Sequence, residues 1–372
     1  MKITAVKTYV LSHPLPRGVG PSTAYYHSRS TLIIKIETDA GLSGWGETTT
    51  FTGVQALIDQ HYAPMLIGQD PIAHRKLWRN LWGPNFGNGM ALGGVDMALD
   101  DLRGKALKLP VAELYGGRLR ERVMVYASAM NYIEGENPAE QYPREAEALL
   151  AQGFGAMKMR IGGQPLRQDL AAMTAVRRVV GDDIKLMADG NGAYTLGSAI
   201  QMGREMEKLG FYWFEEPLPQ SVPEYAGYEV LTDKLDIAIA ACEGLTTRGM
   251  FKEAIARRAM DIVQPDVSLA GGIGECLFVA EMARLWGIQC MPHCWGGGLL
   301  IAATVHLLSL LPDASWARRT EPPMLEYDFV ESPFRDELLS VKLDLRDGYI
   351  TVPTGHGLGV EIDEERLAYY AK

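Results

Sequence analysis

The sequence is poor in cysteine, carries no excess of positive charge and contains no long uninterrupted apolar run. Four cysteines (Cys242, Cys276, Cys290 and Cys294) among 372 residues are too few for a disulfide framework. We therefore expect free thiols and a reducing, cytoplasmic compartment. The net charge of −10 argues against nucleic acid or an anionic membrane surface as a partner, because both are polyanions. A small anionic substrate is still compatible, because a bound divalent cation can reverse the local field.

The longest apolar stretch, 299–311, is interrupted by Thr304, His306 and Ser309. It is shorter than the roughly 20 residues that cross a bilayer, so we expect a buried helix with His306 in the core. The first ten residues alternate apolar and polar side chains like a half-exposed strand, and Lys7 interrupts any signal-type apolar core. We expect no targeting segment and no membrane partner.

The chain changes character near residue 120. Residues 1–120 show strand-like segments at 3–11, 31–38 and 42–48 followed by helical patterns, which predicts an α+β domain. Residues 121–332 alternate strands and helices. Residues 333–372 are expected to return to the first domain. The segment 14–30, with three prolines and two glycines, is expected to be a mobile loop.

The alternating part favours a parallel sheet closed into a TIM-type barrel, an α/β fold. Predicted strands are 123–130, 156–161, 185–189, 211–216, 237–242, 261–266 and 287–292, and predicted helices include 167–180, 196–209 and 273–286.

Charged residues close six of these strands at intervals of 23 to 31 residues: Lys158, Asp189, Glu215, Glu243, Asp266 and His293. A strand, a helix and their loops need about 30 residues. Because the carboxyl ends of barrel strands meet at one rim, where barrel enzymes place their active sites, we expect these side chains to converge.

Three of the six, Asp189, Glu215 and Glu243, are carboxylates on consecutive strands. They would repel one another unless a cation lay among them, and oxygen ligands suit Mg²⁺. The alternative is that each carboxylate caps the following helix. Asp266 and His293 end the next two strands, and a carboxylate that holds an imidazole makes a general base or acid.

Lys158 and Arg160 are two residues apart on a predicted strand and should both point toward the carboxylates. A lysine with a depressed pKa can act as a base, whereas an arginine normally cannot.

These motifs resemble the enolase superfamily. The matching residues are Lys158-x-Arg160, Asp189-Gly-Asn191, Phe214-Glu-Glu-Pro217, Glu243, Gln264-Pro-Asp266, Pro292-His293 and Met324-Leu-Glu-Tyr-Asp328 in the second part, and Gly44-Trp-Gly-Glu47 and the stretch 96–105 in the first. An aspartate on strand six with a histidine on strand seven is similar to the mandelate racemase subgroup. The muconate-lactonizing subgroup instead carries a lysine on strand six.

The resemblance implies an α+β capping domain over a modified (β/α)₇β barrel. It implies that Asp189, Glu215 and Glu243 bind Mg²⁺ while a base removes the proton α to a carboxylate, giving an enediolate. Glu326 would hydrogen-bond the substrate carboxylate, for which it must be protonated, and Asn191 would orient groups near the metal. Substrate contacts are also expected from Tyr26, His27 and Trp295.

Arg160 departs from the family pattern, which has a second lysine there as the base on one face of the substrate. We therefore expect one-base chemistry by His293 and Asp266 rather than two-base racemization. Lys158 and Arg160 would bind substrate, with an acid-base role for Lys158 left open.

The first hypothesis is a Mg²⁺-dependent dehydratase, a hydro-lyase that removes water from a sugar acid. The alternative is a cycloisomerase that opens a sugar lactone or anhydro-sugar acid after the same enolization. Three stretches, Pro292-His-Cys-Trp-Gly296, Pro333-Phe-Arg335 and Gly357-Leu-Gly-Val-Glu361, resemble the sugar-lactone cycloisomerases of this superfamily. Those enzymes keep the second lysine, so Arg160 weakens this match. A third hypothesis is a non-catalytic binding protein that retains the barrel. A homo-oligomer of two to eight chains is expected.

Overall fold

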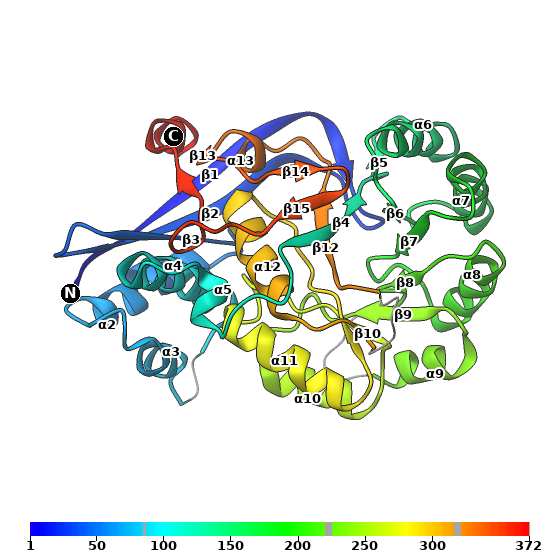
Figure 1. Cartoon of the computed structure of the whole chain (residues 1–372). Coiled ribbons are helices and arrows are strands. Elements are labelled where there is room, and N and C mark those ends of the chain that lie inside the picture. The colour runs from blue at the N-terminus through cyan, green and yellow to red at the C-terminus, as the bar shows by residue number, and fades with distance from the viewer. Residues whose placement is uncertain (85–86, 220–224, 316–320, 372) are drawn as a thin grey trace.

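The computed structural model describes residues 1–84, 87–219, 225–315 and 321–371. An antiparallel sheet with its own helices packs beside a larger, mostly parallel sheet that is surrounded by helices (Figure 1). We call the first part the cap and the second part the barrel. The predicted fold class, a modified barrel with an α+β cap, is confirmed.

The barrel strands pair in chain order from β4 through β6 to β11, and β12 pairs in parallel with the other side of β4. Within the described residues, seven helices alternate with eight parallel strands, which is the (β/α)₇β arrangement. The strands are β4 (Arg122–Ser128), β6 (Ala156–Arg160), β7 (Lys185–Asp189), β8 (Trp213–Glu215), β9 (Ala238–Ala241), β10 (Ile262–Val263), β11 (Gln289–Cys290) and β12 (Met324–Asp328). The helices are α6 (Pro138–Ala151), α7 (Leu166–Val180), α8 (Leu196–Lys208), α9 (Ala226–Lys234), α10 (Arg248–Ala256), α11 (Ile273–Leu285) and α12 (Gly298–Leu310).

An apolar layer fills the barrel interior below the charged rim. It takes one buried side chain from each strand or the residue next to it: Tyr126, Ala156, Met187, Trp213, Ala240, Ile262, Met291 and Met324. On β6 the neighbouring Met157 and Met159 instead pack in the core that includes the surrounding helices. Strand alternation thus turns Lys158 inward, above Tyr126, whose ring centroid lies 5.6 Å from the lysine Nζ.

The cap sheet has the order β3-β2-β1-β5, and β5 belongs to the loop that follows barrel strand β4. Because β5 pairs with the end of β1, the β1–β2 hairpin is attached to the carboxyl end of the barrel. The cap strands are β1 (Ile3–Gly20), β2 (Tyr26–Thr38), β3 (Ser43–Thr48) and β5 (Tyr132–Ile133). The cap helices are α1 (Val54–Leu57), the π-helical turn η1 (Ile58–Tyr62), α2 (Ala63–Leu66), α3 (His74–Trp82), α4 (Gly89–Leu107) and α5 (Val111–Leu114).

The predicted mobile loop at 14–30 is wrong for most of its length. Strand β1 continues to Gly20 and β2 already begins at Tyr26. The prolines are tolerated because the register shifts between the Pro14 and Val19 pairs, so the ladder is irregular where Pro14 and Pro16 lack an N–H.

The Gly44-Trp-Gly-Glu47 stretch lets β3 lie directly against α4. A Cβ atom at Gly46 would lie 2.0 Å from the carbonyl oxygen of Gly94, and one at Gly44 would lie 2.1 Å from that of Ala98. Only glycine allows this approach. The motif therefore fixes the strand that carries Glu47 to the cap core.

The C-terminal segment contacts both parts of the molecule. Strand β15 pairs antiparallel with β4, while α14 packs against β1 and Glu364 forms an ion pair of 2.7 Å with Lys35 on β2. Its elements are α13 (Pro333–Asp336), β13 (Leu339–Val341), β14 (Leu345–Arg346), β15 (Tyr349–Thr351), β16 (Glu361–Ile362) and α14 (Glu364–Tyr370).

All four cysteines are free thiols, as predicted, and His306 is fully buried on α12. Within the described residues, no helix combines the length and apolar character needed to cross a bilayer.

His306 gives the fold a pH dependence. Its Nδ1 accepts the N–H of Ala112, its Nε2 lies 3.1 Å from the carbonyl oxygen of Leu358, and burial lowers its pKa to about 4. In the unfolded chain the His306 imidazole takes up a proton near pH 6.5, whereas in the folded chain it does so only near pH 4. The free energy of unfolding therefore falls as the pH drops from about 6.5 to 4. His306 thereby accounts for a loss of at most about 3 kcal/mol of unfolding free energy over this pH range.

His306→Gln should reduce the dependence of the unfolding free energy on pH, measured by urea denaturation. His356→Gln, at an exposed histidine, should leave that dependence unchanged. Equal slopes in all three proteins would contradict the assignment.

Candidate active site

The three predicted metal-ligating carboxylates converge at the carboxyl end of the barrel. Asp189 and Glu215 are the last residues of β7 and β8, and Glu243 follows β9 by two residues. One carboxylate oxygen from each lies within 4.8 Å of the other two. The side chains of Asp189 and Glu215 are fully buried and that of Glu243 is 26 % exposed.

This trio is suited to a divalent cation. Burial, together with the charge of Asp189, raises the pKa of Glu215 to about 7 despite the nearby Lys158. Burial likewise raises the pKa of Glu243. Buried carboxylates with raised pKa values are short of positive charge, and a set of oxygen donors matches a hard cation such as Mg²⁺.

A second group of potential ligands, His74, Asp96 and Asp100, lies within the cap. His74 Nε2 is 2.6 Å from Asp96 Oδ1, while Asp100 accepts hydrogen bonds from Arg103 and Tyr115. The charges of this group are thus paired with one another and with Arg103. The group can therefore be buried as an internal network of ion pairs.

Lys158 and Arg160 both face the carboxylates, as the strand alternation predicted. Lys158 Nζ lies 2.5 Å from Glu215 Oε1, 2.7 Å from Glu326 Oε1 and 3.6 Å from Asp189 Oδ2. The Arg160 guanidinium donates to Asp189. Although burial alone would lower it, these carboxylates raise the pKa of Lys158, so the lysine is held as a cation.

Asp266 and His293 form the predicted dyad. His293 Nδ1 lies 2.7 Å from Asp266 Oδ2, and Asp266 Oδ1 accepts hydrogen bonds of 2.6 Å from both the N–H and the hydroxyl of Ser268. A carboxylate at Nδ1 assigns the N–H to that nitrogen and leaves Nε2 free. Nε2 is directed toward Glu243, 3.4 Å from its Oε2.

Glu326 lies on β12 between Lys158 and His293. Its Oε2 accepts the N–H of Cys294 at 3.3 Å and lies 4.0 Å from His293 Nε2. The sequence-based expectation was a protonated Glu326. Here, against the effect of burial, the charge of Lys158 and that of His293 when its ring is protonated lower the pKa of Glu326 below the ordinary range, so Glu326 is an anion that holds Lys158.

A cavity of about 450 Å³ opens between this rim and the cap. His293, Asp266, Glu243 and Arg160 line its barrel side. Its size is typical of small-molecule sites. Among the residues expected to contact substrate, Asn191, Tyr26 and Trp295 line it as well.

Tyr26 and Trp295 pack edge to face, with ring centroids 5.6 Å apart. The Asn191 N–H donates to Asp189 Oδ1, while the Asn191 Oδ1 has no partner among the described residues. His27 is exposed and does not line the cavity; its ring lies beside Gly18 on the neighbouring strand.

Two further cavity residues, Arg29 and Glu47, were not identified as site residues from the sequence. Arg29 forms a buried ion pair of 2.8 Å with Asp328, and its guanidinium carbon lies 4.0 Å from the centroid of the Trp295 ring. Glu47 accepts the hydroxyl of Thr31 and two N–H groups at the start of α12. In the sequence, Arg29 and Glu47 are single charged residues in a predicted loop and a predicted strand. Only the contact of Arg29 with Asp328 and that of Glu47 with α12, both visible only in the folded chain, mark them as site residues.

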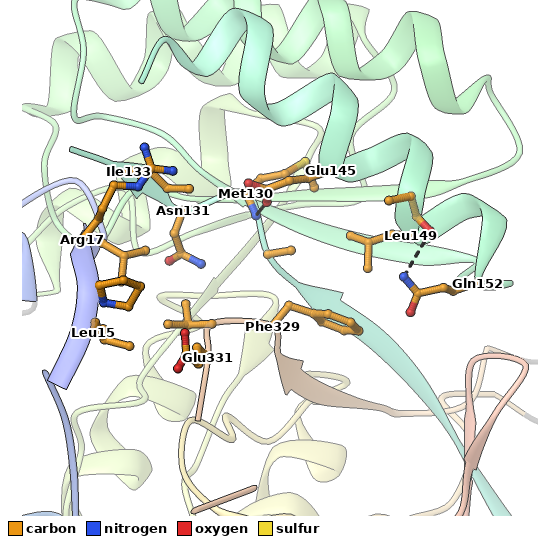
Figure 2. Close-up of a pocket in the computed structure, with 15 residues that line it drawn as sticks. Leu15, Arg17, Met130, Asn131, Ile133, Glu145, Leu149, Gln152, Phe329 and Glu331 are labelled. Carbon is orange, nitrogen blue, oxygen red and sulfur yellow. Dashed lines mark hydrogen bonds between the residues drawn. The ribbon is translucent and has the colours of Figure 1, made fainter. Parts of the chain in front are cut away.

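A second cavity of about 360 Å³ lies beside the first, among β1, α6 and the segment after β12 (Figure 2). Leu15, Leu149 and Phe329 make it largely apolar. Asn131, on its inner wall, accepts a hydrogen bond of 3.4 Å from Arg160 Nε. The cavity therefore borders the site through one side chain and carries none of the dyad or trio.

A barrel that brings a carboxylate trio, an Asp–His dyad and two cations to one rim has the groups that metal-assisted proton abstraction requires. The comparison with known proteins gives the family. Residues 5–116 match the mandelate racemase/muconate lactonizing enzyme N-terminal domain, and residues 141–366 match the enolase C-terminal domain-like family. The chain belongs to the mandelate racemase/muconate lactonizing enzyme family of the enolase superfamily.

Among curated relatives, the chain is 34 % identical over 378 residues to a D-galactarolactone cycloisomerase of Agrobacterium fabrum, covering 100 % of this chain and 99 % of the relative. It is 32 % identical over 345 residues to an arabinonate dehydratase of Saccharolobus solfataricus, covering 90 % and 89 %.

Among solved structures, the 3,6-anhydro-D-galactonate cycloisomerase of Zobellia galactanivorans superposes with a TM-score of 0.88 at 33 % identity, covering 100 % of this chain and 99 % of that one. A racemase of Streptomyces coelicolor A3(2) with bound magnesium gives a TM-score of 0.87 at 27 % identity, with 99 % of both chains covered. The family is thus one of lyases and isomerases, with members that bind magnesium.

Proposed function

We propose that this protein abstracts the proton α to the carboxylate of a sugar acid in a Mg²⁺-dependent reaction and then eliminates water from the neighbouring carbon. The observation that carries this proposal is the Asp266–His293 dyad, whose free Nε2 faces the carboxylate trio at 3.4 Å from Glu243. A base and a metal site must lie this close if one substrate is to contact both.

Asp189, Glu215 and Glu243 would hold the Mg²⁺ ion, as their convergence supports. When bound, the ion supplies the concentrated positive charge that makes the weakly acidic α-proton removable and stabilises the resulting enediolate.

His293 takes the C2 proton on Nε2, and Asp266 stabilises the imidazolium that forms. The protonated ring can then deliver that proton to the hydroxyl leaving from C3 when elimination is syn. Ser268 keeps Asp266 in place through two hydrogen bonds, which fixes the direction of the imidazole.

Lys158 and Arg160 act as fixed cations beside the substrate carboxylate. Lys158 is held between Glu215 and Glu326, and Arg160 between Asp189 and Asn131. With a protonated lysine and an arginine on that side, only the His293 side carries a base. This asymmetry favours elimination over racemization.

A second candidate is ring opening, in which the group leaving from the β-carbon is a ring oxygen rather than water. The specific observation in its favour is that the two cycloisomerases above match this chain over its whole length. Every role given to the dyad, the trio and the cations is the same for both reactions.

The deciding experiment is a screen of mono- and dicarboxylic sugar acids and their lactones with Mg²⁺ in D₂O. For a dehydratase we expect loss of one water, with any C2 exchange seen in the recovered acid, and for a cycloisomerase we expect an isomer; in either product the enol takes up one deuteron at C3 when it becomes the ketone. Mg²⁺ binding with neither exchange nor product formation for any compound would indicate a non-catalytic binding protein and overturn the proposal.

Arg160→Lys tests the one-base assignment. A lysine there could lose its proton and act on the second face, so we expect C2 exchange from both faces, read as epimer formation by NMR. Arg160→Gln is the matched control, because it removes the charge without adding a base. Identical products from Arg160→Lys and the unchanged protein would show that the side chain does not determine the face.

A further inference from the structure

On the cap side of the cavity, the positive charge of Arg29 is already balanced by a buried carboxylate. Arg29, on β2, and Asp328, the last residue of β12, are each only 4 % exposed, and their ion pair measures 2.8 Å. The guanidinium also lies over the Trp295 ring at 4.0 Å. A buried arginine paired in this way has little net attraction for a further anion.

Apart from Glu47, whose oxygens accept hydrogen bonds from Thr31 and from the start of α12, the rest of the cap side offers uncharged hydrogen-bonding groups. Hydroxyl residues on the lining there are Ser28, Ser30, Thr31, Thr49, Thr50 and Ser332. Within the described residues, Arg29 Nη1 and Ser332 Oγ are buried and have no hydrogen-bond partner. Unpaired buried polar atoms in a cavity wall are suited to a ligand that brings hydroxyl or carbonyl oxygens.

Charge balance argues against a second substrate carboxylate. Seven carboxylates line or border the site: Glu47, Asp189, Glu215, Glu243, Asp266, Glu326 and Asp328. The described side-chain cations facing them are Arg29, Lys158, Arg160 and, when protonated, His293. A bound divalent ion favours the ionised form of the carboxylates that hold it. With all seven carboxylates ionised, the seven negative charges exceed the six positive ones of Arg29, Lys158, Arg160, a protonated His293 and the divalent ion. One substrate carboxylate is bound at the metal end, and a second one would meet uncompensated negative potential.

We propose that the Arg29–Asp328 pair selects substrates with a single carboxylate, whose far end is an uncharged polyol or lactone, and rejects the corresponding dicarboxylates. The selection rests on the proposed function, since it takes the substrate carboxylate to lie at the metal end. Arg29 remains a hydrogen-bond donor to the far end, while Asp328 cancels the charge that would attract a second anion.

The test compares D-galactonate with galactarate, which differ only in whether C6 is an alcohol or a carboxylate. Binding is measured by calorimetry with Mg²⁺, independently of turnover. The unchanged protein should bind the monoacid about 10-fold more tightly or better. Asp328→Asn frees the Arg29 charge and should shift the affinity ratio toward the diacid by about 10-fold. The double variant Arg29→Gln/Asp328→Asn should return the preference to the monoacid.

Glu331→Gln is the matched control, because Glu331 lies three residues from Asp328 with a side chain that is 60 % exposed. It should leave the ratio unchanged. Equal or tighter binding of galactarate by the unchanged protein would overturn the proposal without any variant, as would a folded Asp328→Asn protein with an unaltered ratio. C2 exchange in D₂O is followed separately, so absent exchange with intact monoacid selectivity would count against the proposed function alone.

Discussion

Replacing His293 by asparagine is expected to reduce turnover by roughly 10³-fold or more while leaving the affinity for Mg²⁺ nearly unchanged. His293 Nε2 is the free nitrogen of the dyad, whereas the metal oxygens come from the trio. Asparagine keeps a polar group of similar reach beside Asp266 but cannot take a proton. Turnover is measured on the substrate found by the screen, and Mg²⁺ affinity by calorimetry.

His61→Asn is the control for this variant, because His61 is exposed on the cap and does not line the cavity. It should have unchanged turnover. Asp266→Asn should also be impaired, since the amide can no longer stabilise an imidazolium. Activity retained in His293→Asn would refute the assignment of the base, whatever the metal affinity.

Replacing Glu243 by glutamine is expected to weaken Mg²⁺ binding at least about 10-fold and to reduce turnover at limiting Mg²⁺. Substitution of groups that merely support metal ligands already costs 10- to 100-fold, and Glu243 is itself one of the converging carboxylates. Glutamine keeps the shape and removes one negative charge. Partial recovery at high Mg²⁺ is expected, because the other two carboxylates remain.

The control is Asp236→Asn, whose side chain is 99 % exposed outside the site. It removes the same charge and should leave Mg²⁺ affinity unchanged. If the Glu243→Gln protein bound Mg²⁺ as tightly as the unchanged chain, Glu243 would not be a ligand.

The charged rim could be predicted from sequence because it follows from chain geometry alone. Each charged residue closes or follows a short apolar strand, and parallel strands bring such positions to one edge. Lys158 and Arg160 were expected inward because strand side chains alternate, and their contacts with Glu215 and Asp189 agree. These predictions depend on local periodicity, which a single sequence carries.

Features that depend on distant pairing could not be predicted. The segment 14–30 contains turn-forming residues, yet pairing with β5 and a shifted register extend it as a hairpin. Arg29 and Asp328 are about 300 positions apart in sequence, and nothing local to either indicates their ion pair. Sequence reasoning also gave Glu326 a proton, because the closeness of Lys158 to it appears only once β6 and β12 lie in one barrel.

The contacts of Glu47 limit how the cap of one relative can be combined with the barrel of another. This cap carboxylate accepts the N–H groups of Gly297 at 2.5 Å and Leu300 at 3.1 Å, at the first turn of barrel helix α12. That helix follows directly on the segment that carries His293. In a chimera with the cap of a relative and this barrel, the loop that carries His293 would therefore be held by the relative's residue at the position of Glu47. An exchange of substrate specificity between relatives therefore requires that Glu47 and the first turn of α12 be exchanged together.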